Sequence, residues 1–139
     1  MAEPLRFRAL EVGDTFPTFT ARSNVNPQFK FDPAGGRYVV LALLGTITDP
    51  AGQAALALVR EHRTLFDDEK LAFFGVVASP GDEASDAYKT ACKEFRFFLD
   101  FDGAISKQCG ALPVNGETGR SSVPYRRVWV VLDPMLRVI

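Results

Sequence analysis

Cysteine and histidine are scarce in this sequence, which contains two cysteines, Cys92 and Cys109, and one histidine, His62. Sixteen residues separate the two cysteines, so the chain has no CxxC pair for dithiol chemistry. The acidic run 67–69 has no histidine or cysteine beside it, and His62 stands among charged neighbours that mark a solvent face. We therefore expect no metal site and no bound cofactor.

An excess of either charge is also missing, since sixteen Lys and Arg residues oppose seventeen Asp and Glu residues. A surface without a strong positive field has no general affinity for phosphate backbones or anionic lipids, so we expect neither nucleic acid nor a membrane as a partner. The longest apolar run, residues 38–45, is far below the ~20 residues that a membrane span requires. The first residues lack the pattern of a secretory signal, so we expect a cytoplasmic protein with reduced thiols.

The chain has 139 residues, enough for one domain with its own core, which we expect to span residues 1–139. Its apolar runs predict two buried strands, at residues 38–44 and 71–78, joined by a helix over residues 51–66 for which Asp49 is a suitable N-cap. The other expected elements are strands at 19–23, 29–31, 96–99, 127–132 and 136–139, and helices over 82–95 and 103–109. This order predicts an α/β domain with a parallel strand pair at its centre.

Five segments follow one another in a recognisable order. Residues 10–20 contain Val-Gly-Asp-Thr-Phe-Pro-Thr-Phe, and residues 38–44 and 74–80 are the core strands. Residues 99–103 contain Asp-Phe-Asp-Gly, and residues 127–133 read Arg-Val-Trp-Val-Val-Leu-Asp. Together they resemble the peroxiredoxins, the group of alkyl hydroperoxide reductases, thiol-specific antioxidants and redoxins, over nearly the whole chain. The resemblance implies a thioredoxin-like, three-layer α/β fold with a central mixed sheet.

In the family that the chain resembles, a P-x-x-x-T-x-x-C motif at the start of the first long helix supplies the thiolate that attacks a peroxide. A thiolate is stable there because free helix N–H groups lower the thiol pKa and a nearby arginine stabilises the anion. The corresponding segment here, residues 45–53, contains no cysteine. In the ungapped register Gly52 takes the place of the cysteine, and a shift by one residue puts Ala51 there. The former active-site loop then comprises Thr46, Thr48, Asp49, Ala51 and Gly52.

Arg127 lies where the resemblance places the active-site arginine of the family, six residues before Asp133. It is equally a candidate for a solvated residue at a strand end, as many arginines are. Because Asp49 should place a carboxylate near the former thiolate position, we form the hypothesis that Asp49 and Arg127 make an ion pair.

Functions from different classes remain open. The first is a peroxiredoxin-like domain without the peroxidatic cysteine, serving as a non-catalytic binding or interaction module. The second is a divergent thiol-dependent peroxidase or oxidoreductase, an antioxidant enzyme whose catalytic residues are Cys92 or Cys109 together with Arg127. Cys92 has helical spacing to Tyr88 and Phe95, which is typical of a small buried residue, and Cys109 ends a helix, where the dipole raises a thiol pKa. A third function, peroxide sensing through a Cys92–Cys109 disulfide, needs Cα atoms within roughly 7 Å.

A thioredoxin-like sheet normally carries a final helix after its last hairpin, and this sequence ends at Ile139 within that hairpin. We therefore expect the C-terminal helix to be missing and one sheet edge and one face to be bare. An uncovered strand tends to pair with another chain. Two partners follow: a second copy that docks on the exposed C-terminal strand, giving a homodimer, or a following domain of a longer, bacterial-type protein whose N-terminal part is this chain. We favour the longer protein.

Overall fold

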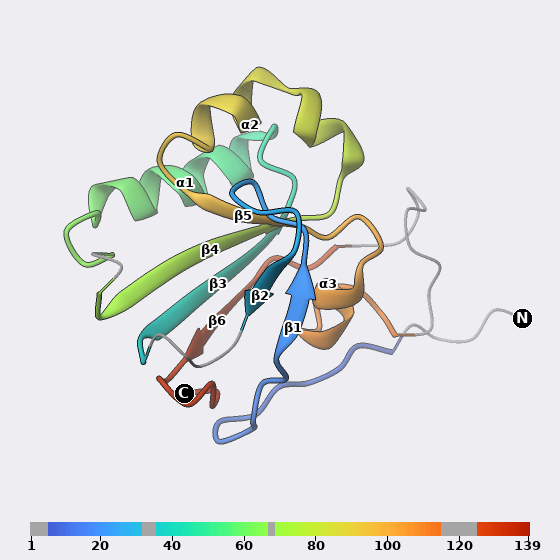
Figure 1. Ribbon diagram of the computed structural model, residues 1–139. Coiled ribbons are helices and arrows are strands. Elements are labelled where there is room, and N and C mark those ends of the chain that lie inside the picture. Colours follow the sequence, from blue (N-terminus) through green and yellow to red (C-terminus); the bar gives the residue numbers. More distant parts are fainter. Residues whose placement is uncertain (1–5, 32–35, 67–68, 115–124) are drawn as a thin grey trace, which may run out of the picture.

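A four-stranded sheet forms the centre of the computed structural model, which describes residues 6–31, 36–66, 69–114 and 125–139 (Figure 1). The strands in spatial order are β5 (Arg96–Leu99), β4 (Leu71–Val77), β3 (Tyr38–Gly45) and β6 (Val128–Leu132). The first three are parallel to one another, and β6 is antiparallel to β3. The sheet is therefore mixed, as the resemblance implied.

β3 is buried along almost its whole length because both faces of the sheet are covered. Successive side chains of a strand point to opposite faces. Accordingly, Leu41 belongs to one hydrophobic core and its neighbour Ala42 to the other. The first core is rich in aromatic rings, of which Phe74 and Phe98 stack with their centroids 5.2 Å apart. Burial on two sides explains why the apolar run of β3 shows no alternation.

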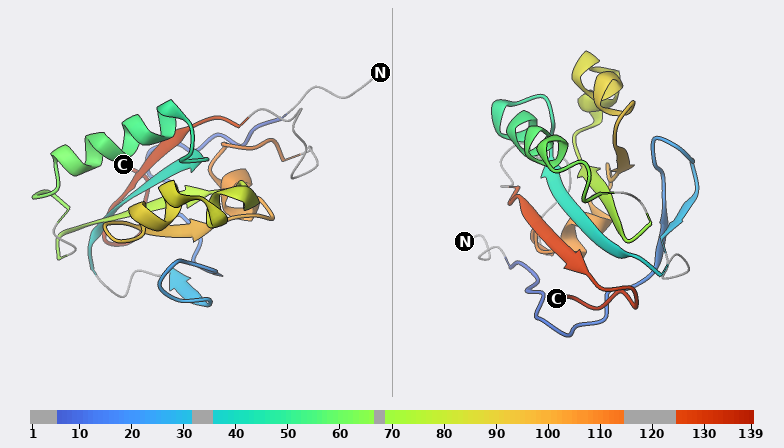
Figure 2. Two further views of the ribbon diagram at one scale, coloured as in Figure 1. Left: turned by 90° about the horizontal axis from the view of Figure 1, so that it is seen from above. Right: turned by 90° about the vertical axis from the view of Figure 1, so that its left-hand side faces the viewer.

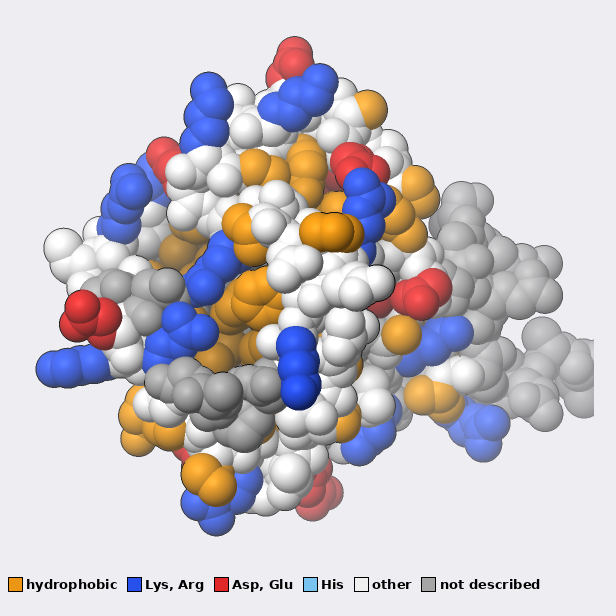
Figure 3. Space-filling view, in the orientation of Figure 1, with side chains coloured by type: hydrophobic (Ala, Val, Ile, Leu, Met, Phe, Trp, Pro, Cys, Tyr) orange, Lys and Arg blue, Asp and Glu red, His pale blue; other side chains and the backbone are white. Residues whose placement is uncertain are grey.

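Helices and a hairpin form the two outer layers. Helices α1 (Pro50–Glu61) and α2 (Asp86–Ala91) and the 3₁₀ helix η2 (Pro80–Ala84) lie on one side of the sheet. On the other side lie the hairpin of β1 (Phe19–Ala21) and β2 (Phe29–Phe31) and helix α3 (Ala104–Gln108). Figure 2 shows the two groups on opposite sides, so the predicted three-layer α/β arrangement is confirmed. The hairpin side is hollowed beside the hairpin, with hydrophobic side chains in the hollow and Lys and Arg around it (Figure 3).

The predicted helix over residues 82–95 is wrong as a single element. It is broken at Ser85, whose extended backbone (φ −78°, ψ 150°) separates η2 from α2. The Ser85 side chain accepts the N–H of Tyr88 at 3.1 Å, so this serine is the N-cap of a new helix. α2 then ends at Ala91, and Phe95 lies beyond it.

The predicted helix over residues 51–66 is too long. α1 begins at Pro50 and ends at Glu61. Hydrogen bonds of the i to i+3 type follow, with the N–H of Leu65 donating to the His62 carbonyl oxygen at 2.9 Å. These bonds tighten the chain into turns, a common ending for an α-helix.

The C-terminal segment 136–139 is paired on both sides, which corrects the expectation of a bare edge strand. On one side the Ile139 N–H donates to the Val131 carbonyl oxygen at 3.0 Å. On the other side the Val138 N–H donates to the Asp14 carbonyl oxygen at 2.8 Å. A segment near the amino end of the chain thus occupies the edge that the sequence left unassigned, and strand alternation alone could not identify it.

On the α1 side of the sheet, near β6, the described residues leave apolar side chains exposed. A groove of about 270 Å³ between α1 and β6 is bordered by apolar side chains. Leu58, Leu65 and Trp129 on this groove are 51%, 60% and 41% exposed. No helix in the described part of the chain has the length and apolar character that crossing a membrane requires.

Candidate functional site at the amino end of α1

The turn between β3 and α1 is built around the capping carboxylate of Asp49. Its Oδ1 atom accepts the Gly52 N–H at 2.7 Å, and Pro50 occupies the first helical position, where no N–H is needed. The predicted N-cap is confirmed. One of the helix N–H groups that an anion would use is therefore already satisfied within the chain.

The hypothesis of an Asp49–Arg127 ion pair is also confirmed. Nη2 of Arg127 donates to Oδ2 of Asp49 at 2.5 Å, and the two side chains are 34% and 39% exposed. The hydrogen bond from the Gly52 N–H and, after it, the contact with Arg127 hold the pKa of the Asp49 carboxyl below its ordinary value. This pair brings the end of the loop before β6 onto the start of α1.

A buried carboxylate that the sequence analysis did not select holds the rest of the loop. Asp82, in η2, is only 2% exposed. Its Oδ2 accepts the Ile47 N–H at 2.8 Å, and its Oδ1 accepts the Thr46 hydroxyl at 2.7 Å. Thr46 and Thr48 share a further hydroxyl hydrogen bond of 2.9 Å. Since a carboxylate can only accept, the Thr46 proton points to Asp82, and the exposed Thr48 hydroxyl donates to Thr46.

The signal for Asp82 was present in the sequence. It follows the second core strand by a few residues, while Thr46 follows the first. The carboxyl ends of adjacent parallel strands meet at one edge of a sheet, so polar residues after both strands belong to one neighbourhood. From the sequence pattern, Asp82 is predicted only as the first residue of the helix over residues 82–95.

The two positions that align with the family cysteine differ in their surroundings. Ala51 is exposed on the first turn of α1, whereas Gly52 is buried. A Cβ atom on Gly52 would stand 2.4 Å from the Thr46 carbonyl oxygen and 2.8 Å from Cα of Ile47. The loop backbone therefore leaves no room for a side chain at position 52.

A second polar network, also missed, positions the segment before Arg127. The Tyr125 ring lies against Gly45, where a Cβ would be 2.8 Å from the ring. Its hydroxyl is 2.9 Å from that of Ser106, which in turn lies 2.7 Å from Oδ2 of Asp100. Asp100 also accepts the Ser106 N–H at 2.7 Å, and burial raises the pKa of its carboxyl. This chain of contacts links the end of β5, α3 and the end of β3.

The two cysteines are free, and they pack on opposite sides of the sheet. Cys109 belongs to the core on the hairpin side, and burial, with a further effect of Asp100, raises the pKa of its thiol to about 12. Cys92 packs against the core on the helix side. A disulfide would have to pass through the sheet, so the geometry does not favour the sensing function.

Cys92 is half-buried and borders a polar cavity of about 400 Å³, which it shares with Arg22, Ser23, Asn24, Glu83, Tyr88, Lys89 and Leu99. The ion pair of Arg127 is with Asp49, and no hydrogen bond joins Arg127 to either cysteine among the described residues. The catalytic role predicted for Arg127 with Cys92 or Cys109 therefore stays a prediction that no contact among the described residues supports. In the same described part of the chain, no cluster of His, Cys, Asp and Glu has the arrangement of a metal site.

The arrangement of layers and strands is that of a thioredoxin-like fold of the peroxiredoxin type. Among solved structures, the peroxidoxin BcpB of Mycobacterium tuberculosis superposes with a TM-score of 0.75 at 16% identity, over 94% of this chain and 83% of that chain. The PrxQ of Xylella fastidiosa gives 0.76 at 13% identity, over 94% and 84% of the two chains.

A third similar structure is longer than this chain. The peroxiredoxin 6 of Arenicola marina gives a TM-score of 0.75 at 16% identity, over 94% of this chain but 63% of its own length. No family model and no curated protein matches the sequence. At identities this low the likeness concerns the fold, and the residues at the amino end of α1 must be judged by their own chemistry.

Proposed function

We propose that this peroxiredoxin-like domain is a binding or interaction module that does not reduce peroxides at the amino end of α1. The observation that carries the proposal is the ion pair of Asp49 with Arg127 at the capped helix end. An internal carboxylate thus takes the two partners, a helix N–H and a guanidinium, that would stabilise a thiolate.

The crowding at Gly52 supports the same proposal. The peroxidase reaction begins when a thiolate attacks the peroxide O–O bond, which forms a sulfenic acid and releases water or an alcohol. Position 52 has no sulfur, and a Cβ there would collide with the Thr46 carbonyl oxygen. Ala51 points to solvent instead.

One observation favours the rival function, a thiol peroxidase that uses Cys92. Cys92 is only half-buried and borders a polar cavity, so its thiol is the more accessible of the two. Cys109 is the weaker candidate, because its thiol is buried and its pKa is raised to about 12.

Peroxide consumption decides between the two functions. Hydrogen peroxide would be followed in the presence of dithiothreitol with the wild-type chain, Cys92→Ser and Cys109→Ser. We expect no turnover above the rate with dithiothreitol alone in any of the three. If the wild type consumes peroxide and Cys92→Ser alone does not, the binding-module proposal is rejected. The protein would then be a thiol peroxidase with Cys92 as its nucleophile.

For a partner, we propose a second copy of this chain, or a following domain, as the sequence suggested. Since segment 136–139 is already paired on both sides, the contact would use the bare groove of α1 and β6 in place of a free strand edge. Sedimentation velocity of the wild-type chain tests the first case: a dimer that Trp129→Gln dissociates supports it, and a monomer at high concentration rejects it.

A further inference from the structure

A second cavity lies at the other end of α1. It has a volume of about 280 Å³, and its lining comes from the carboxyl end of α1, the turns after it, β4 and the start of β5. The lining residues are Val59, Arg60, Arg63, Phe66, Phe73, Glu94, Phe95 and Arg96. The twelve residues of α1 place it about 18 Å from the capped end of the helix. The cavity is therefore separate from the site at the amino end of α1, and it shares Val59 and Phe66 with the groove between α1 and β6.

Three aromatic rings form the apolar part of this cavity. The Phe66 and Phe95 rings stand at 78° and 65° to the Phe73 ring, with centroids 5.7 Å and 5.6 Å away from it. Phe73 is buried and forms the floor of the cavity, whereas Phe66 and Phe95 are only partly buried and form its walls. A flat apolar group placed between the rings would bury further surface of both walls.

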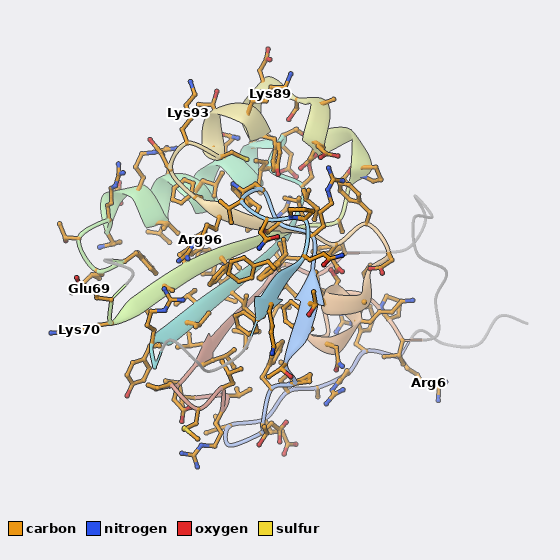
Figure 4. All side chains as sticks on the ribbon, in the orientation of Figure 1. Arg6, Glu69, Lys70, Lys89, Lys93 and Arg96 are labelled. Carbon is orange, nitrogen blue, oxygen red and sulfur yellow. The ribbon has the colours of Figure 1, made fainter. Side chains whose placement is uncertain are left out.

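The charged part of the lining is unbalanced. Arg60 and Glu94 pair with each other, since Nε of Arg60 donates to Oε2 of Glu94 at 2.7 Å. The Arg96 guanidinium lies 4.4 Å from the centroid of the Phe74 ring, which belongs to the core on the hairpin side of the sheet, so Arg63 supplies the positive charge that the described lining residues leave unbalanced. The Arg60 guanidinium also lies 5.6 Å from the Phe95 centroid, a cation–π contact that holds it at the wall. Figure 4 labels Arg96 at the start of β5, on the side of the molecule where α1 ends and β4 begins. The net positive lining favours an anionic group next to the rings.

We propose that this cavity binds a small amphipathic anion, with one or two fused aromatic rings and a carboxylate, sulfonate or phosphate group. The rings would insert between Phe66 and Phe95 above Phe73, and the anionic group would lie at Arg63. A volume near the lower end of the range for ligand cavities limits the ligand to this size. The proposal goes beyond the proposed function, because it holds whether or not the amino end of α1 is catalytic.

Naphthalenesulfonate is a suitable probe, and isothermal titration of the full chain measures its affinity. Trp129, the single tryptophan, is an internal reporter because its ring lies 6.2 Å from that of Phe73. Naphthalenemethanol supplies the same rings without the charge. The test variant is Arg63→Gln. The control is Lys89→Gln, which also removes one positive charge, but from α2 at the top of Figure 4, where Lys89 lines the polar cavity beside Cys92.

We expect saturable binding with one site per chain and a change in Trp129 fluorescence. Arg63→Gln and the neutral alcohol should each lower the affinity about tenfold, the effect of losing one charge-assisted hydrogen bond. Lys89→Gln should bind as the wild type does within about twofold. Absence of saturable binding, equal affinities for sulfonate and alcohol, or equal losses in the two variants would each overturn the proposal. Phe66→Leu, which shortens one wall without removing charge, should weaken both probes alike.

Discussion

Substitution of Gly52 tests whether the loop really has no room for a side chain. The Cβ of Gly52→Ala would stand 2.4 Å from the Thr46 carbonyl oxygen, about 1 Å closer than ordinary contact. The carbonyl cannot move freely, because the neighbouring Ile47 N–H is held by buried Asp82 at 2.8 Å. Overpacking of this kind destabilises by about 3 kcal/mol at its upper end. Alanine recovers about 1 kcal/mol through its higher helix propensity, so the net loss should be about 2 kcal/mol.

Urea unfolding followed by circular dichroism measures this loss. With a slope of about 2 kcal/mol per molar, the midpoint of Gly52→Ala should fall by about 1 M. Gly81→Ala is the matched control, since a Cβ on Gly81 meets nothing within 4 Å. It should leave the midpoint unchanged or raise it slightly, because alanine restricts the unfolded chain. If Gly52→Ala were as stable as Gly81→Ala, the crowding argument would be refuted. Gly52→Cys should be destabilised in the same way and should not gain peroxidase activity.

Asp82→Ala removes the buried carboxylate and leaves the Ile47 N–H unpaired, so the free energy of unfolding in urea titrations should fall by about 2 kcal/mol. An unchanged midpoint would show that water replaces the carboxylate. Because the folded-state pKa of Asp49 is lowered, its stabilising effect is fully present above the ordinary carboxyl pKa of about 4 and is lost as the pH falls below it through the lower folded-state pKa. Asp49→Asn should therefore be less stable than the wild type at neutral pH, and the difference between the two free energies of unfolding should shrink as the pH falls below about 4; a difference that stays constant would contradict this. Tyr125→Phe removes one buried hydroxyl hydrogen bond and should lower the melting temperature by an amount equivalent to about 1 kcal/mol, a loss that calorimetry resolves. Iodoacetamide should label Cys92 well before Cys109, whose thiol is buried with its pKa raised to about 12, and equal labelling rates by mass spectrometry would place Cys109 nearer the surface.

Much of the fold was predictable because it depends on local patterns. The unbroken apolar run of β3 requires burial on two faces, and an Asp-Pro step before a helical pattern is a strong starting signal. The error at Ser85 shows the limit of periodicity. The apolar spacing continued across this residue, but its hydroxyl satisfied the N–H of Tyr88 and started a new helix.

The sequence by itself determined the α/β order of elements, the cap at Asp49 and the absence of a cysteine from the loop, since these depend on patterns along the chain. The three-layer arrangement was expected from the resemblance. The pairing of Asp49 with Arg127 was predictable only through the resemblance, because 78 positions separate them. The tertiary structure alone decided that Asp82 holds the loop from 35 positions away and that the loop backbone closes over Gly52. It also gathered the arginines and phenylalanines of the second cavity from two helix ends and two strands. Such contacts are created by packing, which brings distant segments together at distances that no pattern along the chain encodes.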